Sequence, residues 1–264
     1  MLDNVKSKYI VKEIFENIKN KRKLNIIKYN KKIMIKLDIN KKDFEIYITL
    51  KEFNNKYKIN IEDIDIKELK LNIGNEGVKD LVKINFNNLE VLDLSENKIS
   101  DINILEKINF KELKELHLAD NKISDIKVLE KVKFEKLEVL DLSYNKISDI
   151  NILEKVNFKE LKKLYLDDNN ISNIEVLENV KFEKLELLGL GENKISDINI
   201  LEKVNFKELK ELNLRNNNIS DIKVLKKVKF EKLEELNISG NKIDLTKNNL
   251  IISKLKSLLK RLNI

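Results

Sequence analysis

Few residues in this sequence could carry out catalytic chemistry. It has one histidine, His117, and no cysteine, so a disulfide framework, a thiolate metal site and a cysteine nucleophile are excluded. His117 could form an acid–base pair with Asp93 or Asp141 if the fold placed them on neighbouring strands. Catalysis needs a converging set of acid, base and nucleophile, and one histidine does not supply it. We therefore interpret His117 as an exposed residue of a polar binding surface.

Two other patterns could bind an ion or a phosphate. Aspartates are frequent, but no D-x-D-x-D-G loop gathers them into a calcium site. Gly189 and Gly191 form a lone G-x-G within a predicted strand, and no predicted helix follows it directly. This pattern predicts a shallow dip in a surface rather than a phosphate-binding loop. The sequence thus predicts no enzyme activity, no metal and no cofactor.

The elements that must position these residues come from an internal repeat of 24 residues. Leucine, asparagine and phenylalanine all recur at this step, and seven units begin at Leu89, the last of them incomplete. The unit reads L-x-x-L-x-L-x-x-N-x-I-S-D-I-x-x-L-x-x-x-x-F-x-x. A degenerate unit, Glu68 to Asn88, precedes the series and lacks the asparagine. Neighbouring units alternate between two versions, which indicates that the array grew by duplication of 48-residue pairs.

The spacing of apolar residues predicts the structure of one unit. In L-x-L the leucines alternate with exposed residues, which is the period of a half-buried strand, so one strand per unit should stack into a parallel ladder. In the first unit Leu92 and Leu94 then point inwards, and Ile102–Ile108 forms at most two helical turns on the opposite side. We expect the asparagine column to satisfy backbone groups of adjacent turns, and the phenylalanine column to form a buried spine.

This unit resembles the leucine-rich-repeat family, and the match covers about residues 66–244. The stretch N-K-I-S-D-I-x-x-L, as at Asn97–Leu105 and Asn145–Leu153, looks most like the short repeats of the nuclear regulator of protein phosphatase 1 and of bacterial internalins. The resemblance implies an α/β solenoid with a curved parallel sheet on the concave side, short helices on the convex side, and helical N- and C-terminal caps. We expect the repeats to span residues 61–246.

Residues 1–60 do not repeat and are basic, with 16 Lys and Arg against seven Asp and Glu, a net charge of +9. Apolar residues at helical spacing predict two short helices before residue 37 and a third element with Phe44 and Phe53. The segment is either a helical cap or a small recruitment domain. Residues 10–37 are similar in helical pattern to an F-box, which docks a ubiquitin-ligase adaptor. That resemblance would assign the docking helices to Ile10, Ile14, Phe15, Ile18, Leu24 and Ile27.

Residues 247–264 follow the repeats and predict a C-terminal capping helix. A basic amphipathic helix can also bind a membrane, but directly after a repeat array we expect it to cover the exposed leucines of the last unit. Its predicted apolar face consists of Leu250, Ile251, Leu255, Leu258, Leu259 and Leu262.

The copies of the unit differ mainly at the exposed positions of the strand and in the two residues after it. Strand geometry places these third, fifth, seventh and eighth positions on the concave side, whereas the returning arm, E-K-V-x-F, hardly varies. Neutral drift would change both sides alike, so the pattern favours selection for recognition. The predicted partner-binding residues are Asp93, Glu115, His117, Asp120, Asp141, Tyr144, Lys163, Tyr165, Asp167, Asp168, Glu211, Asn213 and Arg215.

The predicted face is acidic, although the whole chain carries a net charge of +7. The four positions hold ten Asp and Glu against two Lys and Arg, whereas a nucleic-acid reader would place its Lys and Arg there. We therefore expect a basic or mixed-charge protein partner and no nucleic acid. The contact should centre on Tyr144 and Tyr165, because tyrosine is a frequent hot-spot residue.

The function that the sequence favours is a non-catalytic module that binds a protein partner on the concave face. One alternative is an F-box-like substrate receptor of a ubiquitin ligase, which would use the same face and bind the adaptor through residues 1–60. Another, from family resemblance alone, is a phosphatase regulatory subunit. No signal-peptide pattern and no 18-residue apolar run occur, which favours a cytoplasmic location without membrane contact and disfavours an internalin-like surface role.

Overall fold

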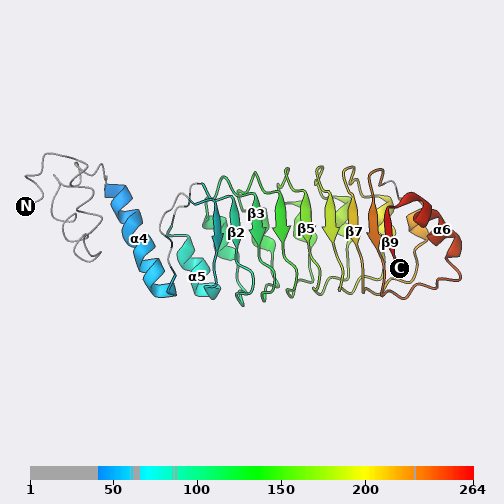
Figure 1. The fold of residues 1–264 in the computed structure, drawn as a ribbon, viewed down its shortest axis with the longest axis horizontal. Coiled ribbons are helices and arrows are strands. Elements are labelled where there is room, and N and C mark those ends of the chain that lie inside the picture. The colour runs from blue at the N-terminus through cyan, green and yellow to red at the C-terminus, as the bar shows by residue number, and fades with distance from the viewer. Residues whose placement is uncertain (1–40, 60, 62–65, 85, 87, 229) are drawn as a thin grey trace, which may run out of the picture. The chain divides into compact units, whose positions relative to one another are not determined.

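The computed structural model of the chain describes residues 41–59, 61, 66–84, 86, 88–228 and 230–264 (Figure 1). The chain divides into two units, Met1–Glu62 and Asp63–Ile264, which we describe separately. In the first unit, residues 41–57 form the helix α4 (Lys41–Tyr57). The third predicted N-terminal element is therefore a helix. The two helices predicted before it, and the F-box-like stretch over residues 10–37, lie outside the described residues.

The chain after α4 is tied back to the helix by one side chain. The amide of Asn54 donates to the carbonyl oxygen of Ile61 over 2.8 Å, and its oxygen accepts from the Ile61 N–H over 3.1 Å. One helical turn apart, the rings of Phe53 and Tyr57 lie with their centroids 4.8 Å apart. These contacts fix the path of the chain as it leaves the end of α4.

The second unit is built on one sheet of nine parallel strands, in which every strand pairs with the next along the chain (Figure 1). The central residue of each strand from β2 to β8 is buried, and Leu92 is aligned with Leu116 in the register that the later strands repeat. The predicted parallel ladder is confirmed. The strands are β1 (Glu68–Lys70), β2 (Val91–Asp93), β3 (Glu115–His117), β4 (Val139–Asp141), β5 (Lys163–Tyr165), β6 (Leu187–Gly189), β7 (Glu211–Asn213), β8 (Glu235–Asn237) and β9 (Arg261–Asn263).

Short helices lie on the opposite side of the unit from the exposed face of the sheet (Figure 1). The degenerate first unit has an α-helix, α5 (Gly74–Leu81), whereas the later units have single 3-10 turns. Asp101 lies two residues before the first of these turns begins and accepts the N–H of Asn103, the first residue of the turn, over 2.9 Å; an Asp or Asn at the same position does so in the following units. The turns are η2 (Asn103–Lys107), η3 (Lys127–Glu130), η4 (Asn151–Glu154), η5 (Glu175–Glu178), η6 (Asn199–Glu202) and η7 (Lys223–Lys226).

The core runs between the sheet and these turns as one continuous apolar column. The phenylalanines are buried from Phe86 to Phe206, and the rings of Phe86 and Phe110 meet edge to face with centroids 6.1 Å apart. The predicted phenylalanine spine is therefore present. Phe230, in the last unit, is only half-buried because no complete unit follows it.

A ladder of buried asparagines joins each turn to its neighbours, as predicted. Asn169 is representative: its amide donates to the carbonyl oxygens of Leu142, Leu166 and Asp167 at 3.0, 3.2 and 3.2 Å. Its oxygen accepts the N–H of Ile147 at 2.9 Å. One side chain thus satisfies backbone groups of two consecutive units, which a buried bend cannot leave unpaired.

The 48-residue duplication has a structural reason in rows of alternating charge. Side chains 24 residues apart lie on adjacent units, and Lys114 binds Glu90 over 2.6 Å while Lys162 binds Glu138 over 2.7 Å. A second row repeats the pattern, for example between Lys136 and Glu112 at 2.6 Å. A strict 24-residue repeat would place like charges side by side along these rows. Alternating two versions of the unit places opposite charges there instead.

The C-terminal segment differs from its prediction as one helix over residues 247–264. A helix is present, α6 (Asn249–Leu258), and it buries Ile251, Ile252 and Leu255. It ends at Leu258, and the chain then adds β9 to the sheet beside β8. The error arose because Leu255, Leu258 and Leu262 continue a helical spacing. Leu262 instead lies at the centre of β9, and Leu258 is 65% exposed.

Candidate functional site

The exposed side of the sheet, together with the turn that follows each strand, forms one continuous surface, which we call the strand face. It is the side predicted to be concave. Predicted binding residues such as Glu115, His117 and Glu211 are the first or third residues of their strands. Others, such as Tyr144 and Arg215, follow the strands directly. The structure therefore brings all thirteen predicted residues onto the strand face, in rows that cross β2 to β7.

One row of the strand face is constrained by its backbone, which sequence comparison alone missed. The eighth position of each unit has a positive φ, between 50° and 69°, and is occupied by Glu96, Asp120, Tyr144, Asp168, Glu192, Asn216 and Gly240. Asn, Asp and Gly tolerate this left-handed conformation best, so part of the variation in this row reflects backbone geometry and not recognition. Glu96, Glu192 and Tyr144 are not of these types, and Tyr144 is the most costly of them, because it is a bulky aromatic residue whose side chain is 59% exposed.

Replacing Tyr144 with asparagine should therefore stabilise the protein, by about 0.5–1 kcal/mol, because asparagine adopts φ near 55° at lower cost. Urea denaturation followed by circular dichroism would measure the change. Asp168→Asn in the same row is the matched control and should leave stability unchanged. A loss of stability in Tyr144→Asn would mean that the tyrosine packs against the fold rather than being held out from it.

The single histidine does not form the acid–base pair considered from sequence. His117 Nε2 lies 3.1 Å from a carboxylate oxygen of Glu115. Asp93 binds Lys70 over 2.8 Å instead, and Asp141 accepts the N–H of Ser143 over 3.0 Å. His117 is thus one polar residue among others on the strand face.

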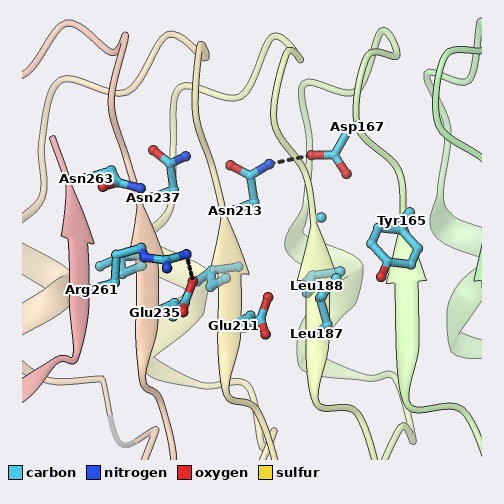
Figure 2. Close-up of a pocket in the computed structure, with 13 residues that line it drawn as sticks. Tyr165, Asp167, Leu187, Leu188, Glu211, Asn213, Glu235, Asn237, Arg261 and Asn263 are labelled. Atoms are coloured by element: carbon cyan, nitrogen blue, oxygen red, sulfur yellow. Dashed lines mark hydrogen bonds and ion pairs between the residues drawn. The ribbon is translucent and has the colours of Figure 1, made fainter.

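A hollow with a volume of about 290 Å³ lies on the strand face over β5 to β9. Figure 2 shows Tyr165 on one side of β6 and Glu211 and Asn213 on the other, with the Asp167 carboxylate reaching across towards Asn213. The hollow reaches Gly189 but not Gly191, and the Asp167 carboxylate covers both glycines, so the predicted dip at these two residues is filled by a side chain of the preceding unit. A Cβ on Gly189 would lie 2.0 Å from Asp167 Oδ2, so glycine is needed for this side chain to fit.

Asp167 is held rigidly at the edge of this hollow. Its Oδ1 accepts the N–H of Gly191 over 2.9 Å and the amide of Asn213 over 2.7 Å. Burial raises the pKa of Asp167, and these two donors oppose the rise. Burial also raises the pKa of the Tyr165 hydroxyl, and the carboxylates of Asp141 and Glu211 add to it. The hollow thus combines a neutral aromatic wall with negative potential.

Further along the face, acids and bases pair with each other. Arg215 binds Glu192, which also accepts the amide of Asn216 over 2.6 Å, and these contacts lower the pKa of Glu192. Within the described ranges, no three His, Asp or Glu side chains converge as metal ligands. In the same part of the chain, none of the helices combines the length and apolar character needed to cross a membrane.

Comparison with family models identifies the repeats. A model of paired leucine-rich repeats matches residues 111–155 and 207–251, and two single-repeat models match residues 87–102 and 161–180. No curated protein sequence matches the chain. The matches cover most of the regular units: one starts at the first leucine of a unit, Leu161, and the others start two residues before such a leucine.

Solved structures with the same fold include internalins of Listeria monocytogenes. The internalin inlF of strain 4b F2365 is 27% identical with a TM-score of 0.59, and the match covers 74% of this chain and 59% of that one, so this chain spans little more than half of inlF. Internalin C2 (inlC2) of the same strain is 26% identical with a TM-score of 0.60, covering 82% of this chain and 94% of that one. The matched repeats, the parallel sheet and these similarities show that the chain is a leucine-rich-repeat protein, with a fold that is typically a protein–protein interaction module.

Proposed function

We propose that this chain is a non-catalytic module that binds a protein partner through its strand face. The proposal depends on the positions at which the repeats differ from one another. They vary at the exposed strand positions and hardly vary on the opposite arm, where E-K-V-x-F recurs. The left-handed row explains some of this variation by backbone geometry, but the first and third strand residues are under no such constraint. Their variation is best explained by recognition.

The character of the face suits a basic or mixed-charge partner. Acidic side chains stand on most of its strands, and several of them, including Asp141 and Glu211, have no cation beside them among the described residues. Nine strands about 4.8 Å apart give a surface roughly 40 Å long. That length accommodates a standard interface of about 800 Å² per partner. Exposed Tyr144 and half-exposed Tyr165 supply the aromatic anchors that such interfaces use.

Affinity purification from the source cell, with the partner identified by mass spectrometry, tests the proposal. The double variant Tyr144→Ala with Tyr165→Ala should lose most of the captured partner, at least ten-fold, while its thermal stability stays close to that of the wild type. The matched control is Glu154→Ala with Lys155→Ala, two exposed residues of the opposite arm, and it should capture the partner normally. Equal loss of the partner in both double variants would contradict an interface confined to the strand face. Normal capture by the tyrosine variant would show that the partner does not bind the strand face through these residues.

A further inference from the structure

We propose that the hollow beside Gly189 is a subsite for an arginine side chain of the protein partner. This inference rests on the proposed function, because it assigns one chemical contact within the strand face. The hollow spans β5 to β9 and is bordered by Tyr165, Asp167 and Glu211. On β6, glycine stands in register with Tyr165 and Asn213 of the neighbouring strands, and the Asp167 carboxylate lies over it at the edge of the hollow.

Glu211, which borders the hollow, is a carboxylate without a counter-charge among the described residues. Along this row of strand starts, Glu115 lies beside His117 at 3.1 Å, and Glu235 binds Arg261 at 2.9 Å. Glu211 is exposed and, among the residues that the structure describes, has neither an ion pair nor a hydrogen bond. Its neighbour in register is the acidic Glu235. A cation supplied from outside would relieve this unbalanced charge.

The surrounding groups do not supply that cation. Asp167 uses Oδ1 for Gly191 and Asn213, and its Oδ2 lies over the Gly189 position. Lys163 is on the same strand as Tyr165, but it forms no ion pair within the described residues and acts electrostatically on Glu186. Arg261, at the far end of the hollow, is already bound to Glu235. The negative potential around Tyr165 is therefore open to a ligand.

The wall of the hollow suits a guanidinium in shape and chemistry. Tyr165 is half-buried and lies on one side of β6 (Figure 2), in register with Gly189, which is covered by the Asp167 carboxylate. A planar guanidinium can stack on an aromatic ring while its N–H groups reach a carboxylate such as Glu211, which a compact ammonium does less well. A metal ion is a poorer fit, because no three acidic ligands converge in the described part of the chain. Arginine uses both the ring and the acid.

The test uses the full chain, labelled with ¹⁵N, and the probe N-acetyl-arginine methylamide. Titration should shift the amide resonances of Gly189 and Gly191, and N-acetyl-lysine methylamide should bind at least three-fold more weakly at the same amides. Glu211→Gln and Tyr165→Leu should each weaken the arginine probe at least five-fold. Glu96→Gln removes the same charge by the same substitution from an exposed residue of the strand face outside the hollow, so it should leave the shifts unchanged.

Three results would overturn the subsite. They are shifts spread evenly over the strand face, equal affinity for the lysine and arginine probes, and equal weakening by Glu96→Gln and Glu211→Gln. The outcome is separable from that of the proposed function. In one outcome, the double variant Tyr144→Ala with Tyr165→Ala loses the captured partner, whereas Glu211→Gln captures as much of it as the wild type does. The proposed interface then stands and the arginine subsite fails. If the arginine probe binds in the hollow but the tyrosine pair captures the partner normally, the subsite stands and the proposed interface fails.

Discussion

Replacing Asn169 with alanine is expected to lower the free energy of unfolding by about 3–5 kcal/mol, although Asn169 is not one of the predicted partner-binding residues. The side chain is 7% exposed, and alanine would remove all four of its hydrogen bonds. The Ile147 N–H would then be buried without a partner, whereas the three carbonyl oxygens would each lose one donor and keep another, from Asn145, Asn193 or the Tyr144 N–H. An unpaired buried group costs about 1–3 kcal/mol and each other lost hydrogen bond about 0.5–1.5 kcal/mol, and partial entry of water would reduce the sum.

Urea denaturation followed by far-UV circular dichroism would measure this loss. Asn169→Asp keeps the acceptor for the Ile147 N–H but places a buried carboxylate against the three carbonyl oxygens, so it should destabilise at least as much as alanine. The control is Asn170→Ala, the next residue, which is half-exposed and whose side chain accepts only from Lys194 over 2.7 Å. It should cost less than 0.5 kcal/mol. Similar losses at 169 and 170 would show that the ladder is not what holds adjacent units together.

The features that the sequence predicted correctly are those repeated within every unit. Leu92 alternates with exposed neighbours, and Phe110 and Asn97 recur at a fixed step, so burial of these residues follows from period and residue type alone. The predicted binding residues were found on one surface for the same reason. In a parallel ladder with one register, positions equivalent in sequence become rows in space.

The features that the sequence did not predict depend on contacts between different units. The position of the Asp167 carboxylate is set by Gly191, one unit later, and Asn213, two units later. The left-handed row is a property of the bend, which its varied residue types conceal. The strand β9 has only three residues, too few for a period of two to be distinguished from a continuing helix. Its edge position beside β8 is a tertiary fact, supported by the Ile238 N–H, which donates to Asn263 over 2.8 Å.

Leu142→Ala is the second large effect that we expect, a loss of about 2–5 kcal/mol. Leu142 is fully buried in the middle of the array, in the same column as Leu118 and Leu166. Truncation would leave a cavity that both neighbouring units must line, because no unit closes its core alone. The carbonyl of Leu142 also accepts from two rungs of the asparagine ladder, Asn145 and Asn169, so any relaxation into the cavity would strain those hydrogen bonds.

Val139→Ala provides the control for this prediction, since it truncates an apolar side chain of the same unit on the strand face, where Val139 is half-exposed. It should cost less than 1 kcal/mol. Thermal and urea unfolding should also show whether all repeats share the loss of stability caused by Leu142→Ala. Because neighbouring repeats are coupled, we expect one transition, in which the whole second unit unfolds at a lower midpoint. A separate early transition, with the rest of the array unfolding at the wild-type midpoint, would contradict this. Coupling between units would then be too weak to hold the rows of the strand face as one rigid surface.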